Sequence, residues 1–133
     1  KKEINSYPFI EIGNYFNNFY KNNLPFDLTN AQKKVLKEIR NDLRKPEQMN
    51  RLLQGDVGSG KTLVALLSML IAIDNQYQSC LMAPTEILAQ QHFQSISKYL
   101  LGMQINVHLL TGSTKKRERD IIYKELLSGE INL

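Results

Sequence analysis

The sequence predicts an α/β fold in which helices cover both faces of a parallel sheet. Short apolar segments alternate with longer helical patterns along the chain, as crossover connections between parallel strands require. A glycine-rich turn stands between one such segment and the apolar helix that follows it. These two observations favour a ligand site at the carboxyl ends of the strands.

The first 23 residues are predicted to be a connector from a preceding region. They are rich in Asn and aromatic residues, and Pro8 prevents one helix from running through them. Apolar residues recur at helical spacing, so we expect a short helix that packs on the domain at residues 24–133 or on a neighbour. They are Ile12, Phe16, Phe19 and Tyr20. Stacking of the aromatic rings on nucleic-acid bases is the alternative.

A helix is predicted to begin after Thr29 and to end near Leu43. Thr29 and Gln32 form a capping box, in which each side chain accepts the main-chain N–H of the other residue. Its apolar stripe consists of Val35, Leu36, Ile39 and Leu43. A polar loop then leads to a short buried strand at residues 50–54.

The turn after this strand fits the phosphate-binding pattern G-x-x-x-x-G-K-[ST] at every fixed position. The expected cofactor-binding residues are Gly55, Asp56, Val57, Gly58, Ser59, Gly60, Lys61 and Thr62. Glycines allow main-chain N–H groups to surround an anion, and the following helix directs its positive end there. We expect ATP or GTP with Mg²⁺, with Lys61 on the β- and γ-phosphates and Thr62 as metal ligand. These two are the candidate catalytic residues.

The alternation of strands and helices continues to the end of the sequence. The predicted elements are a helix at 63–73, a strand at 79–83, a helix at 86–100, a strand at 105–110, a helix at 114–127 and a strand at 131–133. In the helix at 86–100 and just beyond it, the expected core residues are Ile87, Leu88, Phe93, Ile96, Leu100 and Leu101.

Composition indicates a soluble domain with a core of its own. The chain has 133 residues, of which 42% are hydrophobic. No apolar run could span a bilayer and no signal-like segment is found, so we expect a cytoplasmic protein without membrane contact. Cys80 stands alone in an apolar stretch and is predicted to be a small buried core residue, which argues against disulfides and zinc.

The net charge of +4 permits binding to nucleic acid without proving it. Lys115, Lys116 and Arg117 gather at the start of a predicted helix, where the helix dipole disfavours cations. A DNA phosphate would relieve that conflict. A solvated face of mixed charge is the alternative, because acidic residues are interleaved with these bases.

Several of these stretches resemble successive motifs of superfamily 2 helicases. They are Leu28-Thr29 with Gln32, the turn at 55–62, the run from Ala83 to His92, and the run from Leu110 to Ser113. Within the superfamily they are most similar to the RecG family, which Ser59 and Glu86 favour. A DNA translocase similar to the transcription-repair coupling factor is the alternative. The resemblance covers residues 24–133 well and residues 1–23 only loosely.

The resemblance implies a RecA-like P-loop NTPase domain, a three-layer sandwich that is truncated here. It implies ATP and Mg²⁺ as cofactors, and branched or forked DNA as the partner of a monomeric motor. Phe26 and Gln32 are implied as adenine contacts, although Gln32 can equally serve only to cap its helix. The implied contacts with the DNA backbone are Pro84, Thr85, Thr111 and Gly112.

The family's Asp-Glu box and its arginine finger are not found in the sequence. We therefore expect a fragment of the first motor domain that binds nucleotide but does not hydrolyse it alone. A P-loop phosphotransferase or GTPase that does not act on nucleic acid is the second hypothesis. A docking piece that uses the aromatic N-terminal segment is the third.

Overall fold

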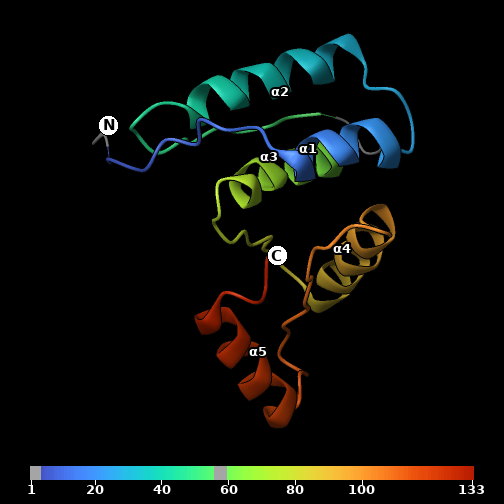
Figure 1. The fold of residues 1–133 in the computed structure, drawn as a ribbon. Coiled ribbons are helices and arrows are strands. Elements are labelled where there is room, and N and C mark those ends of the chain that lie inside the picture. The colour runs from blue at the N-terminus through green and yellow to red at the C-terminus, as the bar shows by residue number, and fades with distance from the viewer. Residues whose placement is uncertain (1–3, 56–59) are drawn as a thin grey trace. The chain divides into compact units, whose positions relative to one another are not determined.

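The computed structural model describes residues 4–55 and 60–133, and the chain divides into two compact units, Lys1–Gln76 and Tyr77–Leu133. The first unit contains α1 (Asn14–Asn18), the π-helical turn η1 (Phe19–Asn23), α2 (Asn30–Leu43) and α3 (Lys61–Asp74) (Figure 1). The second unit contains α4 (Glu86–Tyr99) and α5 (Lys116–Ser128). Among the residues described, no helix has the length and hydropathy needed to cross a bilayer.

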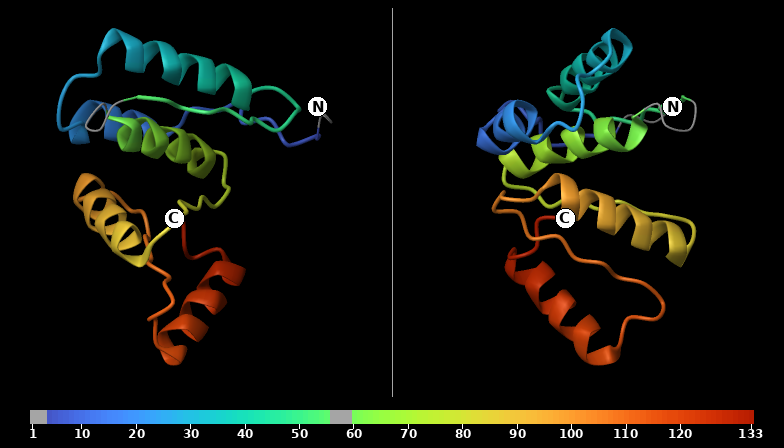
Figure 2. Two further views of the ribbon diagram at one scale, coloured as in Figure 1. Left: turned by 180° about the vertical axis from the view of Figure 1, so that it is seen from behind. Right: turned by 90° about the vertical axis from the view of Figure 1, so that its right-hand side faces the viewer.

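Helix α3 is the core of the first unit. Its sequence is apolar almost all round, as predicted, and α1 and α2 both pack on it (Figures 1 and 2). The buried side chains of this helix are Leu63, Val64, Leu66, Leu67, Leu70, Ile71 and Ile73. The helix that begins at the glycine-rich turn is therefore also the helix around which the unit is built.

The capping box predicted for α2 is present. Thr29 Oγ1 accepts the N–H of Gln32 at 3.2 Å, and Gln32 Oε1 accepts the N–H of Thr29 at 2.9 Å. The helix begins directly after Thr29 and ends at Leu43. Leu36 and Ile39 of the predicted apolar stripe are buried.

Asp74, at the end of α3, caps the short helix α1. Its carboxylate accepts the main-chain N–H groups of Gly13, Tyr15 and Phe16 at 3.0, 3.0 and 3.1 Å. An acidic side chain at a helix N-terminus satisfies donors that lack intrahelical partners and also complements the dipole. This role of Asp74 leaves no local signal in the sequence, because its partners lie about sixty residues earlier in the chain.

Asn75 extends this connection between α3 and the N-terminal segment. Its side-chain amide donates to the Glu11 carbonyl at 2.9 Å and accepts the Glu11 N–H at 3.3 Å. Phe19, in η1, is completely buried at 0% exposure. The short helix expected near residues 12–20 is thus present, and it packs on α3 within the same unit. The assignment of residues 1–23 as a connector stays a prediction.

The helices of the second unit begin close to the predicted residues. Thr85 Oγ1 accepts the N–H of Leu88 at 3.2 Å and so caps α4. Helix α5 begins two residues later than predicted and ends at Ser128. Gly129 caps it with a φ of 82°, in the left-handed region that glycine adopts at low cost.

The predicted core of α4 is partly wrong. Ile96 and Leu100 are buried at 3% and 5% exposure, but Ile87 and Leu101 are 68% and 71% exposed and Leu88 is 38% exposed. The exposed residues belong to the first turn of α4 and to the chain just after it. Helical spacing identifies a stripe of apolar residues but does not reveal how far along the helix a neighbour covers that stripe.

The segments predicted as strands lack the ladders of a regular sheet. An isolated antiparallel bridge joins Asn5 and Glu47, and no longer ladder is formed in the described part of the chain. The strand expected to be buried at residues 50–54 is open to solvent, with Leu52 80% exposed. A parallel strand is buried only when it has neighbours on both edges and helices on both faces, and this segment has no such ladder.

The end of the second unit nevertheless shows parallel pairing in its main chain. Leu133 donates its N–H to the carbonyl of Asn106 at 3.2 Å and accepts the N–H of His108 at 2.9 Å. One residue thus bonds through its N–H and its carbonyl to two residues that flank position 107 on the other segment. This pattern is typical of parallel strands. On the other edge, the Asn132 carbonyl accepts the N–H of Ser79 at 2.9 Å. Three of the predicted strand segments are therefore adjacent, and the pair at 105–110 and 131–133 is hydrogen-bonded in the predicted parallel sense.

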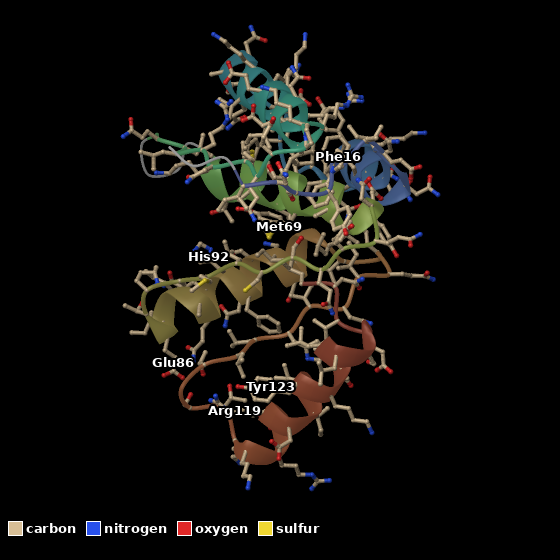
Figure 3. All side chains as sticks on the ribbon, turned by 90° about the vertical axis from the view of Figure 1, so that its left-hand side faces the viewer. Phe16, Met69, Glu86, His92, Arg119 and Tyr123 are labelled. Atoms are coloured by element: carbon tan, nitrogen blue, oxygen red, sulfur yellow. The ribbon has the colours of Figure 1, made fainter. Side chains whose placement is uncertain are left out.

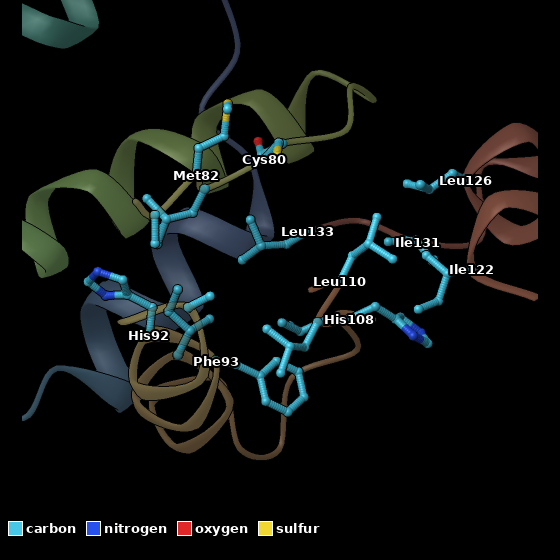
Figure 4. Close-up of a pocket in the computed structure, with 17 residues that line it drawn as sticks. Cys80, Met82, His92, Phe93, His108, Leu110, Ile122, Leu126, Ile131 and Leu133 are labelled. Atoms are coloured by element: carbon cyan, nitrogen blue, oxygen red, sulfur yellow. The ribbon is translucent and has the colours of Figure 1, made fainter. Parts of the chain in front are cut away.

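These segments line an apolar pocket of about 360 Å³ in the second unit (Figure 4). Cys80, Phe93 and Leu133 are among the residues around it. Cys80 is exposed, so its assignment as a buried core residue is wrong. The reason is that its segment borders this open pocket rather than a packed layer. No group of three His, Cys, Asp or Glu side chains in the described residues could hold a metal.

Candidate functional site

The end of the glycine-rich turn is held by Gly60 and Lys61. Gly60 is the N-cap of α3 and has a left-handed φ of 82°. Lys61 Nζ donates to the carbonyl oxygen of Gly55 at 2.5 Å, which joins the two ends of the turn. The predicted cofactor residues between them, Asp56, Val57, Gly58 and Ser59, lie outside the described residues.

The start of α3 presents main-chain donors at this turn. The Gly60 carbonyl accepts its helical hydrogen bond from the N–H of Val64 at 3.1 Å, and no side chain caps the helix. The N–H groups of Lys61, Thr62 and Leu63 precede that bond and have no acceptor within the helix. Together with the positive end of the helix dipole, they form an environment that favours phosphate. Thr62, the predicted metal ligand, is half-buried in this first turn.

The two predicted adenine contacts lie against the same glycine. A Cβ added at Gly60 would collide with the amide nitrogen of Gln32 and would stand 3.9 Å from Phe26 Cε2. The capping bond to Thr29 engages the amide oxygen of Gln32, so the nitrogen end is the one beside Gly60. Phe26 is 49% exposed, which leaves its ring accessible. The capping role of Gln32 is confirmed, and its contact with adenine stays a prediction.

In the second unit, Glu86 joins the two turns that were predicted to follow the DNA backbone. Its Oε1 accepts the hydroxyl of Thr111 at 3.0 Å and also the hydroxyl of Ser113. Glu86 is the first residue of α4 and follows Thr85 directly. Figure 3 shows Glu86 beside the loop that leads to Arg119. Predicted contacts that lie 26 residues apart in the sequence, Thr85 and Thr111, thus belong to one surface of this unit.

The turn that begins at Thr111 is further held through its main chain. Arg119 Nη2 donates to the Thr111 carbonyl at 2.7 Å, and the Thr111 N–H donates to Thr114 Oγ1 at 2.9 Å. The sequence pattern alone did not indicate that Arg119 and Glu86 hold this turn. Only the folded chain shows that the charged side chains of Glu86 and Arg119 both form hydrogen bonds with Thr111.

Hydrogen bonds also set the charge of Glu86. The hydroxyl of Ser113, and then that of Thr111, lower the pKa of Glu86 below its ordinary value of 4.5. The carboxylate is therefore ionised at neutral pH. A negative charge stands where DNA phosphates are expected to pass.

The predicted basic cluster lies at the start of α5. Lys115, Lys116 and Arg117 are all exposed, and Lys115 is the N-cap residue but makes no side-chain capping bond. The ion pairs found among the described residues do not include any of these three cations. Pro84 and Gly112 are exposed as well, and no atom lies within 4 Å of a Cβ built on Gly112. DNA contact by these residues stays a prediction.

Comparison with protein families places this site in context. The family described as DEAD/DEAH box helicase matches residues 29–130. The chain belongs to this family. The match spans both the glycine-rich turn and the two turns joined by Glu86.

Individual relatives with similar sequences are also helicases by name. The chain is 51%, 49% and 51% identical over 110 residues to proteins named ATP-dependent DNA helicase RecG from Synechocystis sp., Aquifex aeolicus and Bacillus subtilis. Each match covers 83% of this chain but only 13%, 14% and 16% of the relative. The resemblance to RecG helicases is confirmed, and the chain spans a small part of their length.

A solved structure described as RecG bound to a three-way DNA junction is similar in three dimensions. It matches with a TM-score of 0.82 and 46% identity, over 87% of this chain and 16% of the matched chain. The family and this structure together indicate a RecA-like P-loop fold. The α/β class is thus confirmed at that level, whereas the regular parallel sheet of a complete sandwich is not formed in the described residues.

Proposed function

We propose that the protein containing this chain is an ATP-dependent DNA helicase that remodels branched DNA and stalled replication forks in recombination and repair. The observation that carries the proposal is the convergence of Phe26, Gln32 and Lys61 on the start of α3. Family membership and the names of the relatives support a helicase motor. The three-way junction bound by the similar RecG structure supports branched DNA as the partner. A monomeric motor in the cytoplasm is part of the same proposal.

The donor set around Gly60 fits a nucleoside triphosphate with Mg²⁺. Main-chain N–H groups at the start of α3 suit phosphate oxygens, and a Cβ at Gly60 would fill part of the space. Lys61 Nζ would exchange the Gly55 carbonyl for the β- and γ-phosphates. The hydroxyl of Thr62 would bind the metal, which neutralises phosphate charge when bound.

Recognition of the base would fall to Gln32 and Phe26. The amide of Gln32 can donate and accept at once, and its oxygen accepts the N–H of Thr29. An adenine edge offers both a donor and an acceptor to such an amide. The exposed ring of Phe26 would cover one face of the base.

DNA would bind along the surface of the second unit where its two turns meet. Thr85 and Thr111 would contact backbone phosphates, with Pro84 and Gly112 allowing close approach. Glu86 supports this proposal because it holds both turns together. Lys115, Lys116 and Arg117 would add contacts that are independent of DNA sequence.

The decisive experiment replaces Lys61 by Ala in the whole protein and measures unwinding of a three-way DNA junction. We expect ATP-dependent unwinding to fall to background, because the cation that faces the phosphates is lost from a surface loop. DNA binding and the circular dichroism spectrum should be unchanged.

Lys98→Ala is the matched control, since Lys98 is exposed on α4 and belongs to neither site. Near-normal unwinding by Lys61→Ala would disprove the assignment of the phosphate-binding turn. ATP turnover that does not respond to added DNA would instead favour a P-loop NTPase that does not act on nucleic acid.

A further inference from the structure

A groove of about 300 Å³ in the first unit lies apart from the glycine-rich turn. The N-terminal helical segment forms one wall, α2 forms the other, and α3 contributes to the lining through Ile71. The residues that give it chemical character are Phe16, Tyr20, Lys33, Lys37 and Arg40. Neither the candidate nucleotide site nor the candidate DNA turns use any of them.

The N-terminal wall is aromatic. The rings of Phe16 and Tyr20 are stacked, with centroids 6.0 Å apart and planes inclined by 13° (Figure 3 labels Phe16). Tyr20 is 39% exposed, so this stacked pair reaches the surface. A pair of aromatic rings at a groove offers a platform on which a planar base can stack.

The α2 wall is cationic. Lys33, Lys37 and Arg40 are spaced so that their side chains share one face of the helix. The acidic residues Glu38 and Asp42 of the same helix are both paired with Arg51 and do not line the groove. No acidic residue is among the described residues that line the groove, so the charged side chains there are all positive.

Arg40 supplies a further sign of a missing partner. Its Nε atom is buried and has no hydrogen-bond partner among the described residues. Native proteins rarely leave a buried donor unsatisfied, because its desolvation is not repaid. A phosphate oxygen is an acceptor that guanidinium groups bind well.

We propose that this groove binds a segment of single-stranded DNA. A base would stack on the Tyr20 side of the aromatic pair, and the adjoining phosphates would contact Lys33, Lys37 and Arg40. Single-stranded rather than duplex DNA fits because duplex bases are already stacked on one another and cannot offer a face to a side chain. The inference rests on the proposed function only for the choice of DNA as the partner.

The first test measures binding of fluorescent oligo(dT) to the whole protein in the absence of ATP. The charge variant is Lys33→Glu with Lys37→Glu, and its matched control is Lys34→Glu with Lys45→Glu, two exposed lysines outside the groove. We expect the groove variant to bind more weakly and its plot of log K against log salt to be shallower by about 1.4, from two lost single-strand phosphate contacts. The control should resemble the wild type.

The second test removes stacking while retaining an apolar side chain. Tyr20→Leu should weaken oligo(dT) binding by at least about fivefold, the lower end of the effect of one base–aromatic stack. Tyr123→Leu, at an exposed tyrosine of the second unit, should have no effect. An oligonucleotide that carries 5-iododeoxyuridine should cross-link to a peptide that contains Phe16 or Tyr20.

The outcomes separate this proposal from the helicase proposal. The proposal for the groove would be overturned if the groove variants bound oligo(dT) with wild-type affinity and salt dependence. Cross-links confined to other peptides would overturn it too. Binding of dTMP is measured alongside, and groove variants that lose dTMP binding but keep oligo(dT) binding would also overturn the proposal, because the site would then take a free nucleotide. Failure of the proposed function, seen as ATP turnover that does not respond to DNA or as near-normal unwinding by Lys61→Ala, would leave these measurements intact, since they use no ATP.

Discussion

At the scale of single residues, Glu86 has two opposing effects. Its hydrogen bonds hold Thr111 and Ser113, and its negative charge repels any phosphate that approaches their hydroxyls. Glutamine has the same shape and can accept the same bonds without the charge. The two effects can therefore be separated by one substitution.

We predict that Glu86→Gln in the whole protein tightens binding to a three-way DNA junction by about 1.5- to 5-fold, the range for one exposed charge pair. Glu86→Ala removes both the charge and the hydrogen bonds to Thr111 and Ser113, so its affinity for the junction should rise less. Fluorescence anisotropy at two salt concentrations measures both, and the gain should shrink at high salt. Weaker binding by Glu86→Gln would show that the charge is not opposed to DNA.

Gly60 combines a left-handed backbone with a close neighbour. Gly60→Ala should cost about 1–2 kcal/mol of stability from its φ alone and should also push away the Gln32 amide, which weakens ATP binding. Gly102→Ala is the matched control, because Gly102 has a φ of 81° but nothing within 4 Å. Thermal unfolding and calorimetric titration with ATP measure the two effects. Equal loss of ATP affinity in both variants would contradict the role given to Gln32.

At the scale of elements, the helices follow from local signals and the strands do not. Thr29 with Gln32 and Thr85 with Leu88 are hydrogen-bonded three residues apart, so each helix start could be recognised in the sequence. A strand takes its hydrogen bonds from another segment. The pairing of Leu133 with Asn106 and His108 could not be derived from any pattern within one of those segments.

Asp74 shows how one element depends on another. Asp74→Ala should cost about 1–3 kcal/mol, because the N–H groups of Gly13, Tyr15 and Phe16 lose their acceptor. The N-terminal segment should then open more often and be cleaved faster by protease within residues 11–23. Thermal unfolding and mass spectrometry of the fragments measure this, with the exposed Asp120→Ala as control. Unchanged cleavage would mean that other contacts, such as buried Phe19 and the bonds between Asn75 and Glu11, suffice to hold the segment.

At the scale of the whole molecule, the two candidate sites belong to different units. The residues around the start of α3 all lie in Lys1–Gln76, and the turns joined by Glu86 all lie in Tyr77–Leu133. ATP binding and DNA binding can therefore be impaired separately. A motor must couple the two, and that coupling is part of the proposed function.

The basic cluster at the start of α5 would also act at this larger scale, through the salt dependence of DNA binding. Replacing Lys115, Lys116 and Arg117 together by Ala should weaken binding to duplex arms of branched DNA and should flatten the salt dependence by about 2.7 in log K against log salt. Lys34, Lys45 and Lys98 form a matched triple control of exposed lysines. An unchanged slope would favour the alternative, in which the cluster is part of a solvated face of mixed charge.

The sequence by itself determined the α/β class, the helix starts, the phosphate-binding turn and the helicase family, since these depend on residues a few positions apart. Only the tertiary structure placed Gln32 beside Gly60, Asp74 on the N-terminus of α1, and Glu86 on Thr111. It also showed Cys80 and Leu52 to be exposed, although the short apolar segments that contain them had predicted their burial. Capping and turn geometry are satisfied within a few residues, whereas burial and long-range hydrogen bonds depend on which segments pack together.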